Sequence, residues 1–236
     1  VSWDGQLGVK SSLTYKGVFI VLIAPDVFET GHGDYIREQL EGDNSVWRIC
    51  SWHKNMRPMQ AGGKSSETGW DVYEEARRGG AIVATGHEHT YSRTHLLSDI
   101  ASRTVADRSD TLHIARGKTF VFVNGMGGKS LRRLRRVPLG DWWAKAYTMD
   151  NGANYGALFG TFGVGGRPDV AEFYFKDIDG RVIDRFTAIS HVRRDARHVS
   201  TGDERLIAAA SSGDVETVEK LLVEGAVVDG RNRSGR

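Results

Sequence analysis

The sequence lacks the features that define several classes of protein. It holds a single cysteine, Cys50, which excludes an internal disulfide framework and leaves the cellular compartment undecided. No apolar stretch approaches the roughly 18 residues that span a bilayer, so we expect no membrane partner. The net charge is only +2, which provides no global field to attract nucleic acid. With 4 prolines, 29 glycines and 39% apolar residues, the composition is that of a globular chain.

The start of the chain also lacks familiar signals. Residue 1 is valine rather than methionine, and no signal-like segment follows it. We therefore expect the amino terminus of a longer protein to be missing, and the sequence leaves the cellular localisation unknown.

Apolar runs alternate with amphipathic segments over the first part of the chain. Strands are predicted at residues 16–24, 46–52 and 81–85, and helices at 34–40 and 70–78. The first run is continuously apolar, which is typical of a strand covered on both faces. The alternation of strand and helix predicts α/β layering.

The section from residue 119 to residue 190 is rich in strands instead. Strands are predicted at 119–124, 156–163 and 169–175. The segment from Phe173 to Phe186 predicts a hairpin that turns at Asp179-Gly180. We interpret this section as the far side of a sandwich.

Three histidines follow predicted strands. His87 and His89 come directly after the strand at 81–85, and His53 ends the strand at 46–52. Side chains two apart in an extended segment point to the same side, so His87 and His89 can converge while Glu88 points away. Imidazole binds zinc, iron and manganese, and sites in α/β sheets gather at the carboxyl ends of strands. A His-x-His pair alone is more often structural, but the three strand-end histidines together favour a metal site.

The remaining histidines and two other segments favour structural interpretations. We expect His32 to be solvated in a turn, and the others to be structural or exposed: His95, His113, His191 and His198. The run 129–136 carries five cations and could attract phosphate or nucleic acid, but an exposed helix face is the favoured interpretation. The glycine-rich segment 160–166 lacks the Lys-Ser/Thr ending of a phosphate-binding loop and is interpreted as a turn.

Several blocks of sequence resemble one enzyme family in their order. Gly86-His87-Glu88-His89-Thr90-Tyr91-Ser92-Arg93 resembles the Gly-His-x-His block of calcineurin-like metallophosphoesterases, and its Tyr-x-Arg end is similar to that of purple acid phosphatases and their bacterial relatives. Ser51-Trp52-His53 is similar to the family's preceding single-histidine block, and Asn124-Gly125-Met126-Gly127-Gly128 to its Gly-x-Gly-Gly segment. Tyr155-Gly156 and residues 179–186 resemble its closing strands. The resemblance covers roughly residues 1 to 190.

The resemblance implies a fold, a reaction and a metal site. The fold would be the second half of a metallophosphoesterase α/β/β/α sandwich over residues 1–190, and the reaction would be the hydrolysis of phosphate esters. The family binds two divalent or trivalent ions about 3.5 to 4 Å apart, and the sequence leaves open whether these are Fe, Zn or Mn. Carried onto this sequence, His53 and His87 would bind one ion and His89 the other. From position alone, the loop after His53 supplies three candidate substrate contacts: Lys54, Asn55 and Arg57.

The chain departs from the family in its carboxylates. The family's earlier blocks, Asp-x-His, Gly-Asp and Asn-His, supply the remaining ligands, yet the sequence contains no Asp-x-His and no Asn-His. Gly33-Asp34 and Gly42-Asp43 are not placed like the family's bridging aspartate. We therefore interpret residues 1–190 as the carboxyl-terminal half of the domain, and we expect this chain to be inactive or nearly so while its intact parent is a phosphatase. The alternative is a non-catalytic phosphoesterase-like scaffold that acts in protein binding.

The end of the chain resembles a different family. Residues 202–236 resemble the start of an ankyrin repeat array, after a linker at 191–201. A helical hairpin is predicted, with helices at 206–211 and 214–224. Such repeats bury their apolar faces only by stacking, so a single repeat is marginal alone. The resemblance implies a protein partner, and an unrelated helical hairpin is the alternative.

Overall fold

The computed structural model describes residues 2–134, 140–192, 209–210 and 212–223 of the chain. The chain divides into two units, residues 1–193 and 194–236. Within the described ranges, no helix has both the length and the apolar character that a membrane crossing requires.

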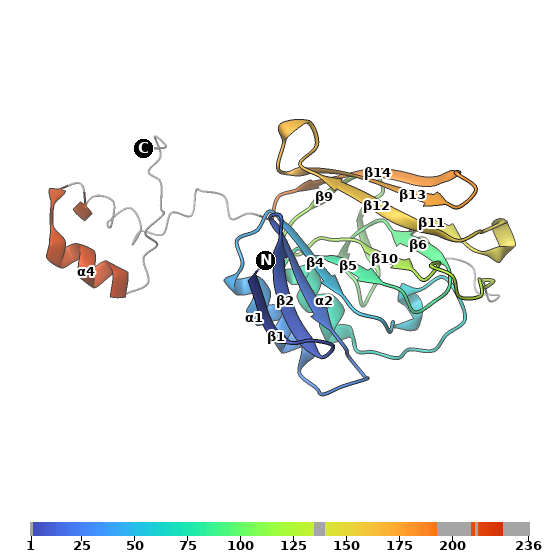
Figure 1. The fold of residues 1–236 in the computed structure, drawn as a ribbon, viewed down its shortest axis with the longest axis horizontal. Helices are drawn as coiled ribbons and strands as arrows, with labels where there is room; N and C mark the ends of the chain where they lie inside the picture. The colour runs from blue at the N-terminus through green and yellow to red at the C-terminus, as the bar shows by residue number, and fades with distance from the viewer. Residues whose placement is uncertain (1, 135–139, 193–208, 211, 224–236) are drawn as a thin grey trace. The chain divides into compact units, whose positions relative to one another are not determined.

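A mixed eight-stranded sheet forms the centre of the first unit (Figure 1). Its strands lie in the order β1-β2-β3-β4-β5-β10-β6-β11, and the inner four, from β3 to β10, run parallel to one another. The bounds are β1 Ser2–Gln6, β2 Lys10–Tyr15, β3 Val18–Ile23, β4 Trp47–Ser51, β5 Ile82–Thr85, β6 Tyr91–Thr94, β10 Val121–Asn124 and β11 Trp143–Tyr147. Parallel strands bring their carboxyl ends to one edge of the sheet, which is where the candidate histidines follow.

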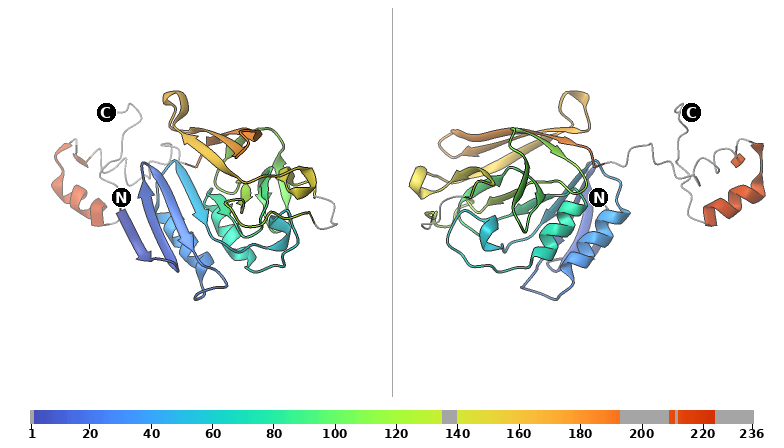
Figure 2. Two further views of the ribbon diagram at one scale, coloured as in Figure 1. Left: turned by 45° about the vertical axis from the view of Figure 1, so that its right-hand side comes forward. Right: turned by 180° about the vertical axis from the view of Figure 1, so that it is seen from behind.

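Two helices lie side by side on one face of this sheet (Figure 2), namely α1 (His32–Gly42) and α2 (Trp70–Arg78). Ile36 and Leu40 of α1 are four residues apart, as are Val72 and Ala76 of α2, so each pair points to one side of its helix. All four side chains are buried, in one apolar cluster with residues of the central strands. Burial of these faces fixes the helices against the sheet.

A four-stranded sheet covers the other face, in the order β12-β13-β14-β9. Aromatic rings fill the layer between the sheets: Phe173 and Phe186 stack with ring centroids 4.9 Å apart, and Phe120 meets Phe186 edge-on at 5.3 Å. The bounds are β9 Thr111–Ile114, β12 Gly156–Phe162, β13 Val170–Asp177 and β14 Val182–Ser190, with β7 Leu96–Asp99 and β8 Thr104–Asp107 as a separate pair. Short 3-10 turns lie at η1 Arg57–Met59, η2 Met149–Asn151 and η3 Val164–Gly166.

A buried ion pair joins the two sheets. Arg93 of β6 donates to Asp184 of β14 through Nε (2.7 Å to Oδ2) and through its terminal nitrogen (3.0 Å to Oδ1), and Tyr91 donates to Asp184 Oδ2 at 2.7 Å. The guanidinium lies 4.1 Å from the ring centre of Phe186. Burial opposes the charge on Asp184, but the hydrogen bonds and the charge of Arg93 outweigh it and lower the pKa of this carboxyl.

Cys50 lies in β4 and is fully buried in the cluster between sheet and helices. Burial raises the pKa of the thiol by more than the charge of Arg48 lowers it, so the group is neutral at physiological pH.

The elements agree with most of the sequence predictions. The helices predicted at 34–40 and 70–78 and the strands that became β3, β4, β5, β10 and β12–β14 are confirmed, and the expected hairpin is formed by β13 and β14. β3 buries one face only, since its side chains alternate between buried and half-buried. The predicted helix at 129–136 is wrong for its described part, because residues 129–134 contain no helical turn.

The prediction that His32 is solvated is also wrong. Its side chain is buried at the first turn of α1, where Nε2 donates to the carbonyl oxygen of Phe28 at 2.7 Å. A histidine between two glycines is typical of a turn, but α1 begins at His32 and the ring is buried at the first turn of this helix.

The second unit is described over a few residues only. Helix α4 (Val215–Val223) lies within the predicted helix at 214–224, and Asp214 accepts from the backbone N–H of Thr217 at 3.1 Å, which satisfies a free donor of the first turn. Ala209 and Ala210 are helical, and most of the other expected helix lies outside the described residues. The described residues therefore do not show an ankyrin repeat.

Candidate metal centre

The ends of neighbouring strands bring two of the candidate histidines together. β4 ends at Ser51 and β5 at Thr85, and the two strands pair in parallel. His53 and His87 each follow two residues after their strand. Since the strands end at the same edge, the two rings meet there, as the sequence predicted from strand ends.

The two rings face each other through single nitrogens. His87 Nδ1 lies 3.0 Å from His53 Nε2, and the ring planes are 76° apart. His53 is exposed and His87 is half-buried. Partial burial lowers the pKa of His53, and the neighbouring His87 and Lys64 add to this effect. The neutral form of His53, the form that binds a metal ion, is thus favoured at this edge.

A carboxylate holds the opposite nitrogen of His87. Glu67 Oε2 lies 2.6 Å from His87 Nε2, and the hydrogen bond from His87 lowers the pKa of the Glu67 carboxyl. Because a carboxylate only accepts, the proton of neutral His87 is on Nε2, which leaves a lone pair on Nδ1 facing His53. Sequence reasoning missed Glu67, since it lies in an irregular loop whose path no periodicity reveals.

His89 is held from a different direction. Its Nδ1 donates to the carbonyl oxygen of Ser130 at 2.8 Å, and its own carbonyl accepts from the backbone N–H of Arg132 at 3.1 Å. The neutral ring therefore keeps its lone pair on Nε2. The segment after β10 thus fixes His89 in place, while loop 54–69 fixes His87.

Glu88, between the two histidines, points away from them into the interior. It is fully buried, and its Oε2 accepts from the backbone N–H groups of Gly63 (2.9 Å) and Lys64 (3.1 Å). Lys64 Nζ in turn contacts the carbonyl oxygen of His87. Burial, followed by the nearby charge of Arg132, lowers the pKa of Lys64. These contacts lock loop 54–69 onto the histidine segment.

Two glycines make this close approach geometrically feasible. A Cβ at Gly62 would collide with the carboxyl group of Glu88, and a Cβ at Gly125 would collide with the backbone oxygens of Glu88 and Gly86. The strand-end turn and the loop can pack this closely only because these residues have no side chain.

The three candidate substrate contacts from the sequence lie in unlike environments. Lys54 is half-buried, and its Nζ lies 3.8 Å from Oε1 of Glu67, the carboxylate that is hydrogen-bonded to His87. Arg57 is exposed at the start of η1. Asn55 is fully buried, and its Oδ1 accepts from the hydroxyl of Tyr73 at 2.9 Å. The structure therefore keeps Lys54 and Arg57 within reach of solvent and encloses Asn55.

An open cavity of about 450 Å³ lies at the ends of the parallel strands, beside His53. Residues of β4, β5 and β10 line it, and the Oδ1 atom of Asn124 at this edge is buried with no hydrogen-bond partner among the described residues. An orphaned acceptor is costly unless a ligand, an ion or water satisfies it. The cavity is therefore suited to a polar occupant.

The donor set fits one half of a metal site. Two nitrogens on one tetrahedral zinc ion, each bonded at 2.0–2.1 Å, are roughly 3.3 Å apart. The observed separation of 3.0 Å between His53 Nε2 and His87 Nδ1 needs only a small opening to admit an ion. Across the described part of the chain, no group of three or more His, Cys, Asp or Glu side chains is arranged to hold a metal. The described residues therefore do not show a complete metal site.

Two solved structures are similar to this chain, and the first of them has the same fold. A purple acid phosphatase from yellow lupin (Lupinus luteus) seeds superposes with a TM-score of 0.63 at 18% identity, over 76% of this chain and 32% of that chain. A structure of PhoD matches with a TM-score of 0.41 at 12% identity, over 92% of this chain and 51% of that one. No protein-family model and no curated protein matches the sequence. The first unit is thus a mixed α/β fold like that of the lupin phosphatase, and the chain spans about a third of that protein's length.

Proposed function

We propose that this chain supplies the histidine ligands of a metal-dependent phosphoesterase site, which hydrolyses phosphate esters. The observation that carries the proposal is the meeting of His53 and His87, with nitrogens 3.0 Å apart and a carboxylate on the remote nitrogen of His87. Metal-ligating histidines commonly donate their other N–H to a carboxylate or a backbone carbonyl. His87 donates to the carboxylate of Glu67, and His89 donates to the backbone carbonyl of Ser130.

In the proposed site, His53 Nε2 and His87 Nδ1 bind one ion, and His89 Nε2 belongs to a neighbouring ion. Ions of Fe, Zn or Mn would supply polarisation of the phosphoryl oxygen and a bound water of lowered pKa. The residues of this chain orient the ligands: Glu67 accepts the hydrogen bond from His87 Nε2, and the carbonyl oxygen of Ser130 accepts the one from His89 Nδ1. Lys54, beside Glu67, is placed to approach the substrate from the same loop.

Three neutral histidines do not balance the charge of two divalent ions. We assign the missing carboxylates to further sequence of a longer parent protein, in keeping with the small share of the lupin phosphatase that the chain spans. The 236-residue chain is then inactive or nearly so, and the intact parent is the phosphatase.

The second candidate function is a phosphoesterase-like scaffold without catalysis, acting in protein binding. It is favoured by the described residues themselves, which hold no group of three metal-ligating side chains. The ankyrin-like sequence at 202–236 would supply the partner surface in that case.

Metal titration of the purified chain tests the proposal. We expect Zn²⁺ or Mn²⁺ binding that is lost in His53→Ala and in His87→Ala. A matched control is His113→Ala, since His113 and His191 form another pair with nitrogens 2.9 Å apart. Unchanged metal affinity in both His53→Ala and His87→Ala would contradict the proposal. Metal binding without phosphate-ester hydrolysis in a longer form of the protein would instead support the scaffold.

A further inference from the structure

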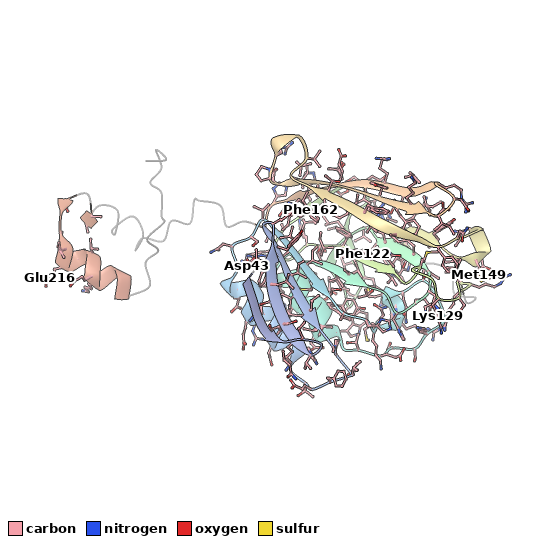
Figure 3. The ribbon with its side chains drawn as sticks, viewed as in Figure 1. Asp43, Phe122, Lys129, Met149, Phe162 and Glu216 are labelled. Carbon is pink, nitrogen blue, oxygen red and sulfur yellow. The ribbon has the colours of Figure 1, made fainter. Side chains whose placement is uncertain are left out.

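A second cavity, of about 470 Å³, opens next to the candidate metal centre. We call it the basic pocket, and its lining consists of Gly63, Lys64, Leu131, Arg132, Arg133 and Met149. Figure 3 labels Met149 and Lys129, which lie at the same end of the first unit. Three of the six lining residues are cations, contributed by two segments that are far apart in sequence.

The pocket wall is attached to the candidate ligands on both sides. Lys64 Nζ contacts the carbonyl oxygen of His87, and the backbone N–H of Arg132 donates to the carbonyl oxygen of His89 at 3.1 Å. The ammonium group of Lys64 and the backbone of Arg132 are therefore held next to the two histidine residues. An anion bound to them would lie beside whatever the histidines hold.

The carboxylates near the pocket lie outside its lining. Glu88 is buried beneath the wall with one oxygen 3.7 Å from Arg132, and Asp150 pairs with Arg133 at 3.0 Å. Within the described residues, Lys64 forms no ion pair with a carboxylate, and its contact with His87 uses one of its three N–H donors. The lining of the pocket thus holds three cations and no carboxylate, while Glu88, Asp150 and, through its field on Lys64, Glu67 act on these cations from outside the lining.

A purely structural role does not account for this arrangement. Bracing Glu88 requires one cation at most, because its Oε2 already accepts two backbone N–H groups. Gathering further cations around one cavity costs repulsion between like charges, which an anionic occupant relieves. The run 129–134 is therefore a pocket wall rather than the exposed helix face that the sequence suggested.

We propose that the basic pocket binds a second anionic group of the substrate, the distal phosphate of a diphosphate or of a bisphosphate ester. This assignment rests on the proposed function, since it places the phosphoryl group that reacts at the histidines. The substrate class is then a compound with two phosphates, and the pocket discriminates against simple monoesters. Guanidinium and ammonium groups are the usual partners of phosphate in proteins.

Pyrophosphate binding to the full 236-residue chain, measured by calorimetry in chelator at low salt, tests the pocket without any metal. We expect pyrophosphate to bind more tightly than inorganic phosphate, and Lys64→Gln and Arg133→Gln each to weaken it roughly fivefold to tenfold. Arg167→Gln is the matched control, because Arg167 is 61% exposed and pairs with Asp169, as Arg133 is 69% exposed and pairs with Asp150. We expect it to leave the affinity unchanged.

Arg133 lies at the surface, so its replacement leaves the fold intact and keeps the test decisive even if Lys64→Gln perturbs the loop. Absence of pyrophosphate binding, or equal affinity in Arg133→Gln and Arg167→Gln, would overturn the pocket while leaving metal binding at His53 and His87 untouched. Conversely, loss of the proposed metal site leaves this chelator experiment unaffected. The two proposals can therefore fail separately.

Discussion

Glu67 and His87 are joined by a hydrogen bond of 2.6 Å between Oε2 and Nε2, on the side of the ring remote from His53. Because the acceptor is a carboxylate, the bond selects one tautomer of the imidazole and turns its lone pair toward the neighbouring histidine. Glu67 is thereby a positioning residue for the candidate ligand, and its removal provides a direct test of that role.

Replacement of Glu67 should weaken metal binding without removing a ligand. We expect Glu67→Ala to lower the Zn²⁺ affinity by about 10- to 100-fold, and Glu67→Gln to lower it less, because the amide oxygen can still accept from Nε2. Competition with a chromogenic chelator measures the affinity, and ¹⁵N NMR reports the tautomer of His87 in the metal-free chain. A ring protonated on Nδ1 in the wild type would contradict this role.

The pair between Arg93 and Asp184 should contribute strongly to stability, because breaking it leaves a charge buried between the sheets. We expect Asp184→Asn to lower the free energy of unfolding by about 3 kcal/mol or more. Arg185→Gln, at the neighbouring exposed position, should change it by less than about 0.5 kcal/mol. Urea unfolding followed by tryptophan fluorescence measures both. Similar losses in the two variants would show that the ion pair contributes little.

The same carboxyl predicts a dependence of stability on pH. Its pKa in the folded chain is below the ordinary value of 3.8, so the folded state favours the ionised form. The stabilisation is therefore complete above pH 3.8 and is lost as the pH falls through the lower folded pKa. We expect the difference in unfolding free energy between wild type and Asp184→Asn to be constant near neutrality and to shrink in acid. A difference that grows on acidification would have the wrong sign.

Gly125 and Gly127 should respond differently to the same substitution. A Cβ at Gly125 collides with backbone oxygens of the histidine segment, whereas a Cβ at Gly127 meets no atom within 4 Å. We expect Gly125→Ala to cost about 1–3 kcal/mol and Gly127→Ala to be nearly neutral. Thermal unfolding of the two variants measures the contrast. Equal melting temperatures would mean that the turn relaxes around the added methyl group.

The sequence predicts the elements whose burial is periodic. α2 was predicted with the bounds that the structure gives it, because Gly79-Gly80 ends the helix, and its buried face carries Val72 and Ala76. β1 and β2 were not predicted, since β2 buries Ser11 and Ser12 and therefore shows no apolar alternation. Their pairing with β3 extends the sheet through backbone hydrogen bonds, which hydrophobic patterns do not record.

The residues of the candidate site also divide into those that the sequence predicts and those that it does not. The meeting of His53 and His87 follows from parallel strand ends, and it could be foreseen from two apolar runs and the histidines after them. Glu67 and Lys64 could not be foreseen, because their positions depend on how loop 54–69 folds back onto Glu88. Such a loop is determined by individual hydrogen bonds and glycine contacts rather than by periodicity.

Cys50 gives the molecule an internal chemical reporter. The thiol is reachable only when the cluster between the sheet and the helices opens, so its rate of reaction with a thiol reagent measures the opening of the core rather than the reactivity of the sulfur. β4 also leads to His53, which lies three residues after Cys50. An ion held by His53 and His87 would bind only the closed sheet and would slow the labelling in proportion to its occupancy. A single natural cysteine could thus report occupancy of the metal centre in solution, with no label introduced by mutation.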